Sequence, residues 1–168
     1  MGPGIEITDV PIGERGGLFH ILDESFEGLY LWHARRTLQS IEVVHVARTA
    51  TGEAVGLIML KVLPEGAGYV FYVAVAQRFR RRGVGGKLLD DGISYFSGNG
   101  IQDVYASVEE ENDESKELFV SRGFQRVGKS ELNERYGRVR ALLMRREMVV
   151  VWGEVLLVKR LGGADHAP

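Results

Sequence analysis

Apolar and polar residues recur along the chain with two different periods, and the changes of period predict its elements. Residues 5–10 alternate as a strand does. Residues 14–39 instead place apolar side chains three and four positions apart, which predicts two helices separated near Gly28. Residues 43–47 and 54–62 then predict two strands that a short turn joins.

A continuous apolar run at residues 68–75 predicts a strand that is covered on both faces. A helix is expected at residues 87–96, a strand at 104–108 and a second helix at 113–121. Gly123 is well placed to end that helix in a left-handed conformation.

The C-terminal third predicts further strands, at residues 124–127 and 139–148, on either side of a polar loop that contains Tyr136. Residues 149–161 add apolar, β-branched material. The order of these elements predicts an α/β protein (α+β in some schemes), with one mixed sheet flanked by helices.

We expect residues 1–148 to form a single domain and residues 149–168 to be a C-terminal strand extension that ends in a mobile tail. An uncovered strand as apolar as residues 149–158 would promote aggregation, so it must be buried. It either covers a sheet edge or pairs across a homodimer interface, and we favour the homodimer.

Composition limits the classes of function. The chain has 168 residues, 45% of them hydrophobic and 26% charged, as is usual for one globular domain. Its net charge of −2 argues against nucleic acid as the main partner. No segment is apolar and long enough to span a bilayer, and the first residues do not resemble a signal peptide, so we expect no membrane partner.

The types of residue present exclude some chemistry. Without cysteine the chain forms no disulfide, thiolate zinc site or cysteine nucleophile, which is consistent with a cytoplasmic location. The four histidines show no metal-ligand spacing, so no metal is expected.

Arginine and glycine crowd into residues 80–86, Arg-Arg-Arg-Gly-Val-Gly-Gly, between the apolar strand and the following helix. A helix begins with about four unpaired N–H groups and with the positive end of its dipole. Glycine lets the backbone approach an anion closely, and arginine adds charge-assisted donors. The stretch therefore predicts a phosphate or pyrophosphate site.

Two common nucleotide motifs do not fit this stretch. A Walker loop that ended at Gly86-Lys87 would need glycine at Arg81. A dinucleotide fingerprint that began at Gly83 would need glycine at Leu88.

The pattern Arg-x-x-Gly-x-Gly at Arg80–Gly85 resembles the GNAT superfamily of acyl-CoA-dependent N-acyltransferases. A second segment, Asn112-x-x-Ser115-x-x-Leu-Phe119-x-x-x-Gly-Phe124, resembles that family's N-x-x-A-x-x-L-Y-x-x-x-G-F helix. The resemblance covers all but the last 20 or so residues. It implies a GNAT-like, mostly antiparallel sheet, splayed at the strands that bind CoA.

The resemblance implies acetyl-CoA as co-substrate. The loop N–H groups would hold the pyrophosphate, and residues 73–75 would pair with the pantetheine arm as an added strand. Asn112 would hydrogen-bond the pantetheine. The residues assigned to CoA in this way are Val73, Ala74, Val75, Arg80, Arg81, Arg82, Gly83, Val84, Gly85, Gly86, Asn112, Ser115 and Phe119.

Catalytic groups are less evident. Many relatives have tyrosine, as the acid for the leaving thiolate, where this chain has Phe119. The thiolate then leaves unaided or takes its proton from water or a neighbour such as Ser115, or else the chain binds CoA without catalysis.

For the base we favour Tyr69, acting directly or through water, since some N-terminal acetyltransferases have tyrosine there. Their histidine or glutamate partner is replaced by Ser107. The alternative role for Tyr69 is a core or cleft aromatic. Glu109 begins an acidic run that either attracts and deprotonates an ammonium group or stabilises the next helix start.

The acceptor site is expected to include Phe26, Tyr30, Ser107 and Tyr136. The predicted function is N-acetyl transfer from acetyl-CoA to a primary amine, by direct attack in a ternary complex. The amine is a protein N-terminus, a lysine or a small molecule. A non-catalytic CoA-binding module is the alternative.

Overall fold

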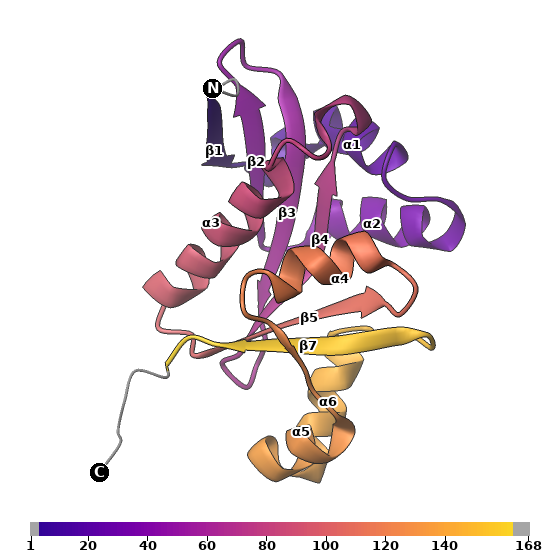
Figure 1. Cartoon of the computed structure of the whole chain (residues 1–168), viewed down its shortest axis with the longest axis vertical. Coiled ribbons are helices and arrows are strands. Elements are labelled where there is room, and N and C mark those ends of the chain that lie inside the picture. The colour runs from indigo at the N-terminus through magenta and orange to yellow at the C-terminus, as the bar shows by residue number, and fades with distance from the viewer. Residues whose placement is uncertain (1–3, 163–168) are drawn as a thin grey trace. The chain divides into compact units, whose positions relative to one another are not determined.

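Seven strands and six α-helices make up the described part of the chain, residues 4–162 of a computed structural model (Figure 1). The strands are β1 (Ile5–Asp9), β2 (Val43–Thr49), β3 (Ala54–Val62), β4 (Gly68–Val75), β5 (Asp103–Glu109), β6 (Gln125–Arg126) and β7 (Glu154–Arg160). The helices are α1 (Phe19–Asp23), α2 (Gly28–Ser40), α3 (Val84–Gly98), α4 (Asp113–Val120), α5 (Lys129–Tyr136) and α6 (Arg138–Glu147). Two 3-10 helices, η1 (Ile12–Leu18) and η2 (Gln77–Phe79), complete them.

The chain divides into two compact units. The first comprises the residues up to Lys61 together with Val70–Gly92, and the second comprises Val62–Tyr69 and the residues from Ile93 onwards. Strand order is β1-β2-β3-β4 in the first unit and continues as β4-β5-β7-β6 in the second, because β4 belongs to both. This is the predicted mixed, mostly antiparallel α/β arrangement. None of the described helices is long and apolar enough to cross a membrane.

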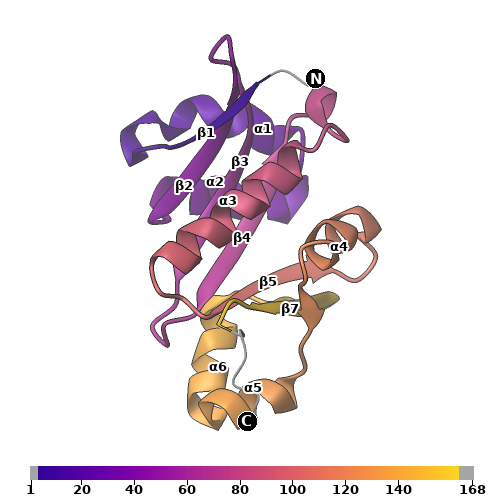
Figure 2. The same ribbon diagram turned by 60° about the vertical axis from the view of Figure 1, so that its left-hand side comes forward.

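Both faces of β3 are buried in the first unit. Leu57 and Met59 face the core that α1 and α2 complete with Ile21 and Leu38. On the alternate residues, a Cβ added at Gly56 would lie 2.9 Å from Leu88 of α3. Helix α3 therefore covers one face and α1 and α2 the other, as Figures 1 and 2 show, which is why β3 reads as a continuous apolar run.

The second unit is built on the pairing of β5 with β7. These strands are antiparallel over their whole length, from Asp103 opposite Arg160 to Glu109 opposite Glu154. Helix α4 and the α5–α6 hairpin lie on either side of this pair (Figures 1 and 2).

The prediction of a strand at residues 139–148 was wrong, because this segment is helix α6. Its Arg-Val-Arg start alternates as a strand does, but the alanine, leucine, methionine and arginine that follow are strong helix formers. Ala141 and Met144 are buried one turn apart and anchor the helix. The polar loop predicted around Tyr136 is likewise helix α5, whose Glu131 accepts from the Gly128 N–H at 3.2 Å.

The strand predicted beyond residue 148 is present as β7, and it lies between β5 and β6. Gln125 and Arg126 of β6 pair with Val158 and Leu157. The domain division at residue 148 and the homodimer stay predictions. The mobile tail was predicted for residues beyond 161, most of which lie outside the described residues.

Candidate active site

The candidate residues for acyl transfer fall into two groups, one in each unit. In the first unit, helix α3 begins at Val84, so the last three residues of the arginine-glycine stretch form its first turn. Arg81 and Gly83 have positive φ angles of 58° and 79°. Left-handed residues at these two positions turn the chain tightly before the helix, and the first N–H groups of α3 are left without helical partners. The loop thus has the backbone form that binds an anion.

The arginines of this loop have different surroundings. The Arg80 side chain faces the protein: its Nε donates to the Val75 carbonyl at 3.0 Å, and its Nη2 donates to the Glu24 carbonyl at 2.6 Å. Arg78 pairs with Glu53. Within residues 4–162 the exposed Arg81 side chain has no hydrogen-bond or ion-pair partner. Arg80 therefore fixes the loop, whereas Arg81 is available to a ligand.

The strand before the loop carries the residues assigned to pantetheine. Ala74 is buried in the core of the first unit, and Val73 and Val75 are half-buried. Since Val75 also holds Arg80 through its carbonyl, the strand and the loop are fixed to each other.

Aromatic side chains gather between α2 and β4 in the first unit. Phe26 packs edge-on against Tyr72, with 5.0 Å between ring centroids. Nδ1 of His33 lies 2.7 Å from the Tyr72 hydroxyl. Sequence reasoning selected Phe26 and the half-buried Tyr30 but missed the His33–Tyr72 pair, because 39 residues separate its members and no motif joins them.

In the second unit, the structure brings Tyr69 and Ser107 together. Their hydroxyl oxygens are 2.7 Å apart, and Tyr69 is 2% exposed. One residue of this pair is at the end of β4 that belongs to the second unit and the other is on β5. The pair forms a short, largely buried hydroxyl–hydroxyl contact, through which a proton can be held or passed.

A second polar network lies along the same face of β5. Tyr105 donates to the Tyr136 hydroxyl at 3.2 Å, and Tyr136 donates to Oδ2 of Asp103 at 2.7 Å. Arg135 forms an ion pair with the same carboxylate. Burial raises the pKa of Tyr105 far above its usual value, and the hydrogen bond with Tyr136 adds to this. Burial likewise raises the pKa of Tyr136.

Tyr136 therefore lies in a helix that is held to β5, and not in the hairpin loop expected from the sequence. Its hydroxyl is engaged by Tyr105 and Asp103. A role in binding the acceptor stays a prediction.

The residues of the second family segment lie on α4. Oδ1 of Asn112 accepts from the Ser115 N–H at 3.0 Å and caps the helix, which leaves the amide NH₂ of Asn112 for a ligand. Phe119 is 5% exposed and packs edge-on against Phe124, with 5.1 Å between ring centroids. Phe119 thus belongs to the core under α4.

Glu109 ends β5 and is exposed. It stands opposite Glu154 in the pairing of β5 with β7. Oε2 of Glu154 accepts from the Val151 N–H at 3.1 Å. The Glu109 carboxylate has no hydrogen-bond or ion-pair partner within residues 4–162. An unpaired carboxylate beside a second one attracts a cation. No group of three metal-ligating side chains occurs among the described residues.

Comparison with known families identifies the protein family to which these elements belong. The model of the Acetyltransferase (GNAT) family matches residues 17–124. The chain belongs to this family. The match includes the arginine-glycine loop, the Tyr69–Ser107 pair and the α4 segment, and it ends just before β6.

Solved structures agree with a GNAT fold. The ribosomal-protein-S18-alanine N-acetyltransferase of Escherichia coli has a TM-score of 0.69 at 15% identity, over 98% of this chain and 99% of that one. An IAA acetyltransferase from Bacillus cereus gives 0.69 at 17% identity, over 94% and 100%. N-acetylglutamate synthase from Neisseria gonorrhoeae, complexed with coenzyme A and N-acetyl-glutamate, gives 0.68 at 19% identity, over 97% of this chain and 36% of that one. Identities this low show the GNAT fold alone. Curated protein sequences give no match.

Proposed function

We propose that the chain is an N-acetyltransferase that transfers the acetyl group of acetyl-CoA to a primary amine. The observation that carries this proposal is the loop before α3. Its left-handed residues and helix N-terminus fit a pyrophosphate, and it lies within the segment that matches the GNAT family. A cytoplasmic location is part of the same proposal.

In this proposal the loop N–H groups from Arg81 to Gly86 bind the pyrophosphate, and Arg81 and Arg82 add side-chain charge. Arg80 contributes by holding the loop to Val75 and Glu24. Val73, Ala74 and Val75 present their strand to the pantetheine arm. Asn112 offers its amide NH₂, while its oxygen caps α4. Ser115 and Phe119 complete the set, Phe119 as an apolar contact.

The acyl transfer forms a C–N bond and breaks the C–S bond of the thioester. We assign to Tyr69 the removal of the proton from the incoming ammonium group, directly or through an ordered water. Ser107 orients the tyrosine hydroxyl through their 2.7 Å contact. The thiolate leaves with a proton from solvent, since Phe119 has none to give. Glu109 attracts the ammonium group, and Phe26 and Tyr30 contribute to the acceptor site.

The amine is a protein N-terminus, a lysine side chain or a small amine. Ribosomal-protein alanine is acetylated by one structural neighbour, by its name, and the others named here take different substrates. A homodimer formed through the C-terminal strand remains part of the proposal.

Titration calorimetry with acetyl-CoA tests the binding step. Gly85→Glu places a carboxylate in the pyrophosphate loop and is expected to abolish binding by charge repulsion. Gly98→Glu is the control, because Gly98 lies in the last turn of α3, away from the loop, with a regular helical φ and nothing within 4 Å of an added Cβ. If the Gly85→Glu protein and wild type bind acetyl-CoA with equal affinity, the loop does not bind the pyrophosphate.

The second candidate function is a CoA-binding module without catalysis, which the buried Phe119 favours. Release of free thiol from acetyl-CoA, measured against a panel of amines and N-terminal peptides, separates the two. Turnover with any amine supports the transferase, and binding without turnover across the panel supports the module.

A further inference from the structure

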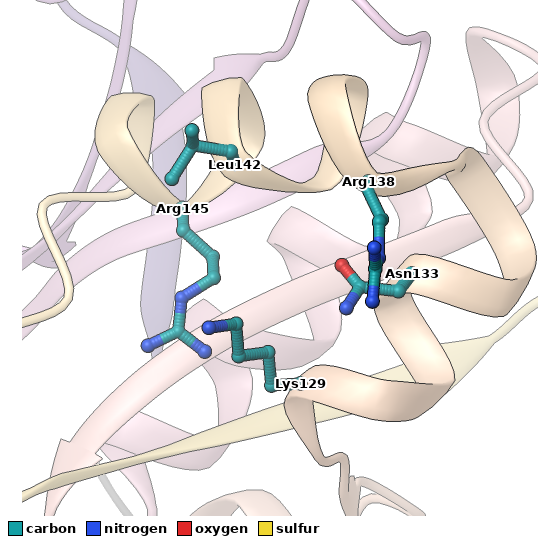
Figure 3. Close-up of a pocket in the computed structure, with 5 residues that line it drawn as sticks. All are labelled: Lys129, Asn133, Arg138, Leu142 and Arg145. Carbon is teal, nitrogen blue, oxygen red and sulfur yellow. The ribbon is translucent and has the colours of Figure 1, made fainter.

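A cleft lies between α5 and α6, outside the segment that matches the GNAT family. Its volume is about 340 Å³. The side chains that line it are Lys129, Asn133, Arg138, Leu142 and Arg145. In Figure 3 the side-chain ends of Lys129 and Arg145 point toward one another, and Arg138 extends toward Asn133.

The three cations of this cleft have no anionic partner in the described part of the chain. Neither an ion pair nor a hydrogen bond joins Lys129, Arg138 or Arg145 to a carboxylate within residues 4–162. Like charges that converge without a counter-charge repel one another, and an anion placed between them would reverse this.

The surrounding sequence strengthens the local positive charge. Residues 125–147 contain seven basic and three acidic residues, in a chain whose net charge is −2. A second copy of the chain, docked symmetrically on this face, would bring the same cations together. The charge therefore favours an anionic ligand over self-association.

Packing fixes the two helices that present the cleft. Leu132 of α5 and Ala141 and Met144 of α6 are buried. The ion pair from Arg135 and the hydrogen bond from Tyr136 hold the end of α5 to Asp103 of β5. The cationic side chains therefore extend from two helices whose positions are fixed by packing, as a binding site requires.

We propose that the α5–α6 cleft binds a phosphate group. Lys129 and Arg145 flank the phosphate, and Arg138 and the Asn133 amide donate to its remaining oxygens. The cleft is larger than a phosphate ion needs, and Leu142, which is 66% exposed, gives it an apolar wall. The ligand is therefore an organic phosphate whose carbon part contacts Leu142. Its source is either a soluble phosphorylated molecule or a phospholipid headgroup.

The test uses glycerol 3-phosphate as the soluble probe and phosphatidylcholine vesicles that contain phosphatidate as the lipid probe. Binding of each to the full chain is measured by calorimetry and by vesicle sedimentation. Saturating CoA is present in one series, so that phosphate bound at the Arg80–Gly86 loop is recognised by its displacement. If the chain does not bind CoA, the proposed function is refuted. Phosphate binding at the cleft can still be tested with both probes.

Two double variants decide the location. Lys129→Gln with Arg145→Gln removes two cations from the cleft. Arg140→Gln with Arg146→Gln removes two exposed cations of the same helix that do not line it. We expect the first variant to lose at least about tenfold in affinity and the second to change it little.

Binding of glycerol 3-phosphate that only the cleft variant weakens supports a soluble ligand, and vesicle binding with the same variant pattern, without soluble binding, supports a headgroup. The proposal is overturned if neither probe binds, or if both double variants weaken binding equally, because net charge alone would then explain the effect.

Discussion

The Arg15 guanidinium donates to four backbone carbonyls, those of Val10, Leu38, Ile41 and Glu42, at 2.5 to 3.2 Å. These acceptors lie just after β1, in the last turn of α2 and in the two residues that separate α2 from β2, so one side chain joins segments that are far apart in sequence. Arg15 is 2% exposed, and burial lowers its pKa although Asp9 opposes the shift. A buried arginine is tolerated where its donors are satisfied in this way.

Arg15→Met keeps the bulk and removes every donor, so these carbonyls lose their partner. We expect the free energy of unfolding to fall by about 3 kcal/mol or more, measured by urea denaturation. Arg15→Lys is the control, because an ammonium group satisfies some of the carbonyls and should cost less. A loss below about 1 kcal/mol in Arg15→Met would show that water replaces the donors.

Tyr69→Phe removes the hydroxyl that contacts Ser107 and leaves the ring in place. If Tyr69 moves the proton, turnover should fall by about 100-fold with CoA affinity unchanged. The matched control is Tyr105→Phe, which removes a buried hydroxyl from the same unit and should leave turnover near wild type. Wild-type turnover in Tyr69→Phe would rule out this tyrosine as the base.

Single residues were predictable from sequence where the family resemblance marked them. It marked the loop and Asn112, and it also singled out Tyr69 and Ser107. No motif includes Arg15, which lies between a glutamate and two glycines, and its acceptors are backbone carbonyls, which the sequence does not distinguish. The His33–Tyr72 pair depends on how α2 lies on β4 and was missed for the same reason.

Among the elements, α3 depends on glycine for its position. An added Cβ at Gly92 would lie 2.9 Å from the end of the Ile58 side chain and 3.1 Å from that of Leu60 on β3, so any side chain at this position has to displace them. Because the pyrophosphate loop leads into α3, the position of this helix also sets the position of the loop.

Gly92→Leu should force α3 away from β3. We expect the free energy of unfolding to fall by about 1–3 kcal/mol and CoA affinity to fall with it, as measured by denaturation and calorimetry. Gly98→Leu, in the last turn of the same helix, adds the same side chain where nothing lies within 4 Å of an added Cβ. Similar losses in both variants would contradict close packing at Gly92.

Element prediction worked for segments with long apolar periodicity and failed in the C-terminal third. Helices α1 and α2 follow one another with a break before Gly28, and Gly123 ends α4 with a φ of 85°, as predicted. In residues 129–147 the alternation at Arg138 to Arg140 suggested a strand, and the apolar run at residues 141–144 has no clear helical period. The helix-forming residues of this run favoured a helix, and the burial of Leu132, Ala141 and Met144 shows which side of the helical hairpin faces the core.

At the scale of the whole molecule, stability in alkali should depend on the β5 tyrosines. Burial raises the pKa of Tyr105 and Tyr136 in the folded state. Below pH about 10 both states keep these protons, and above it only the unfolded chain releases them. Stability is therefore fully present below pH 10 and is lost as the pH rises further.

Denaturant titrations between pH 8 and 11 check this expectation. The free energy of unfolding should fall by up to about 1.4 kcal/mol per pH unit for each tyrosine that keeps its proton in the folded state. Tyr105→Phe should show a shallower fall, because one of the two groups is gone. Identical slopes in the variant and wild type would exclude this tyrosine as the origin.

The strand order β5-β7-β6 also constrains how the protein is made. Strand β6 pairs with β7, which the ribosome completes after both β5 and β6. Until Arg160 emerges from the ribosome, β5 lacks its partner strand β7 along all seven of its residues. Strand β6 also has no strand to pair with until then. Newly made chains therefore expose an open sheet edge for the longest time in the second unit, and chaperones or premature association should act there first.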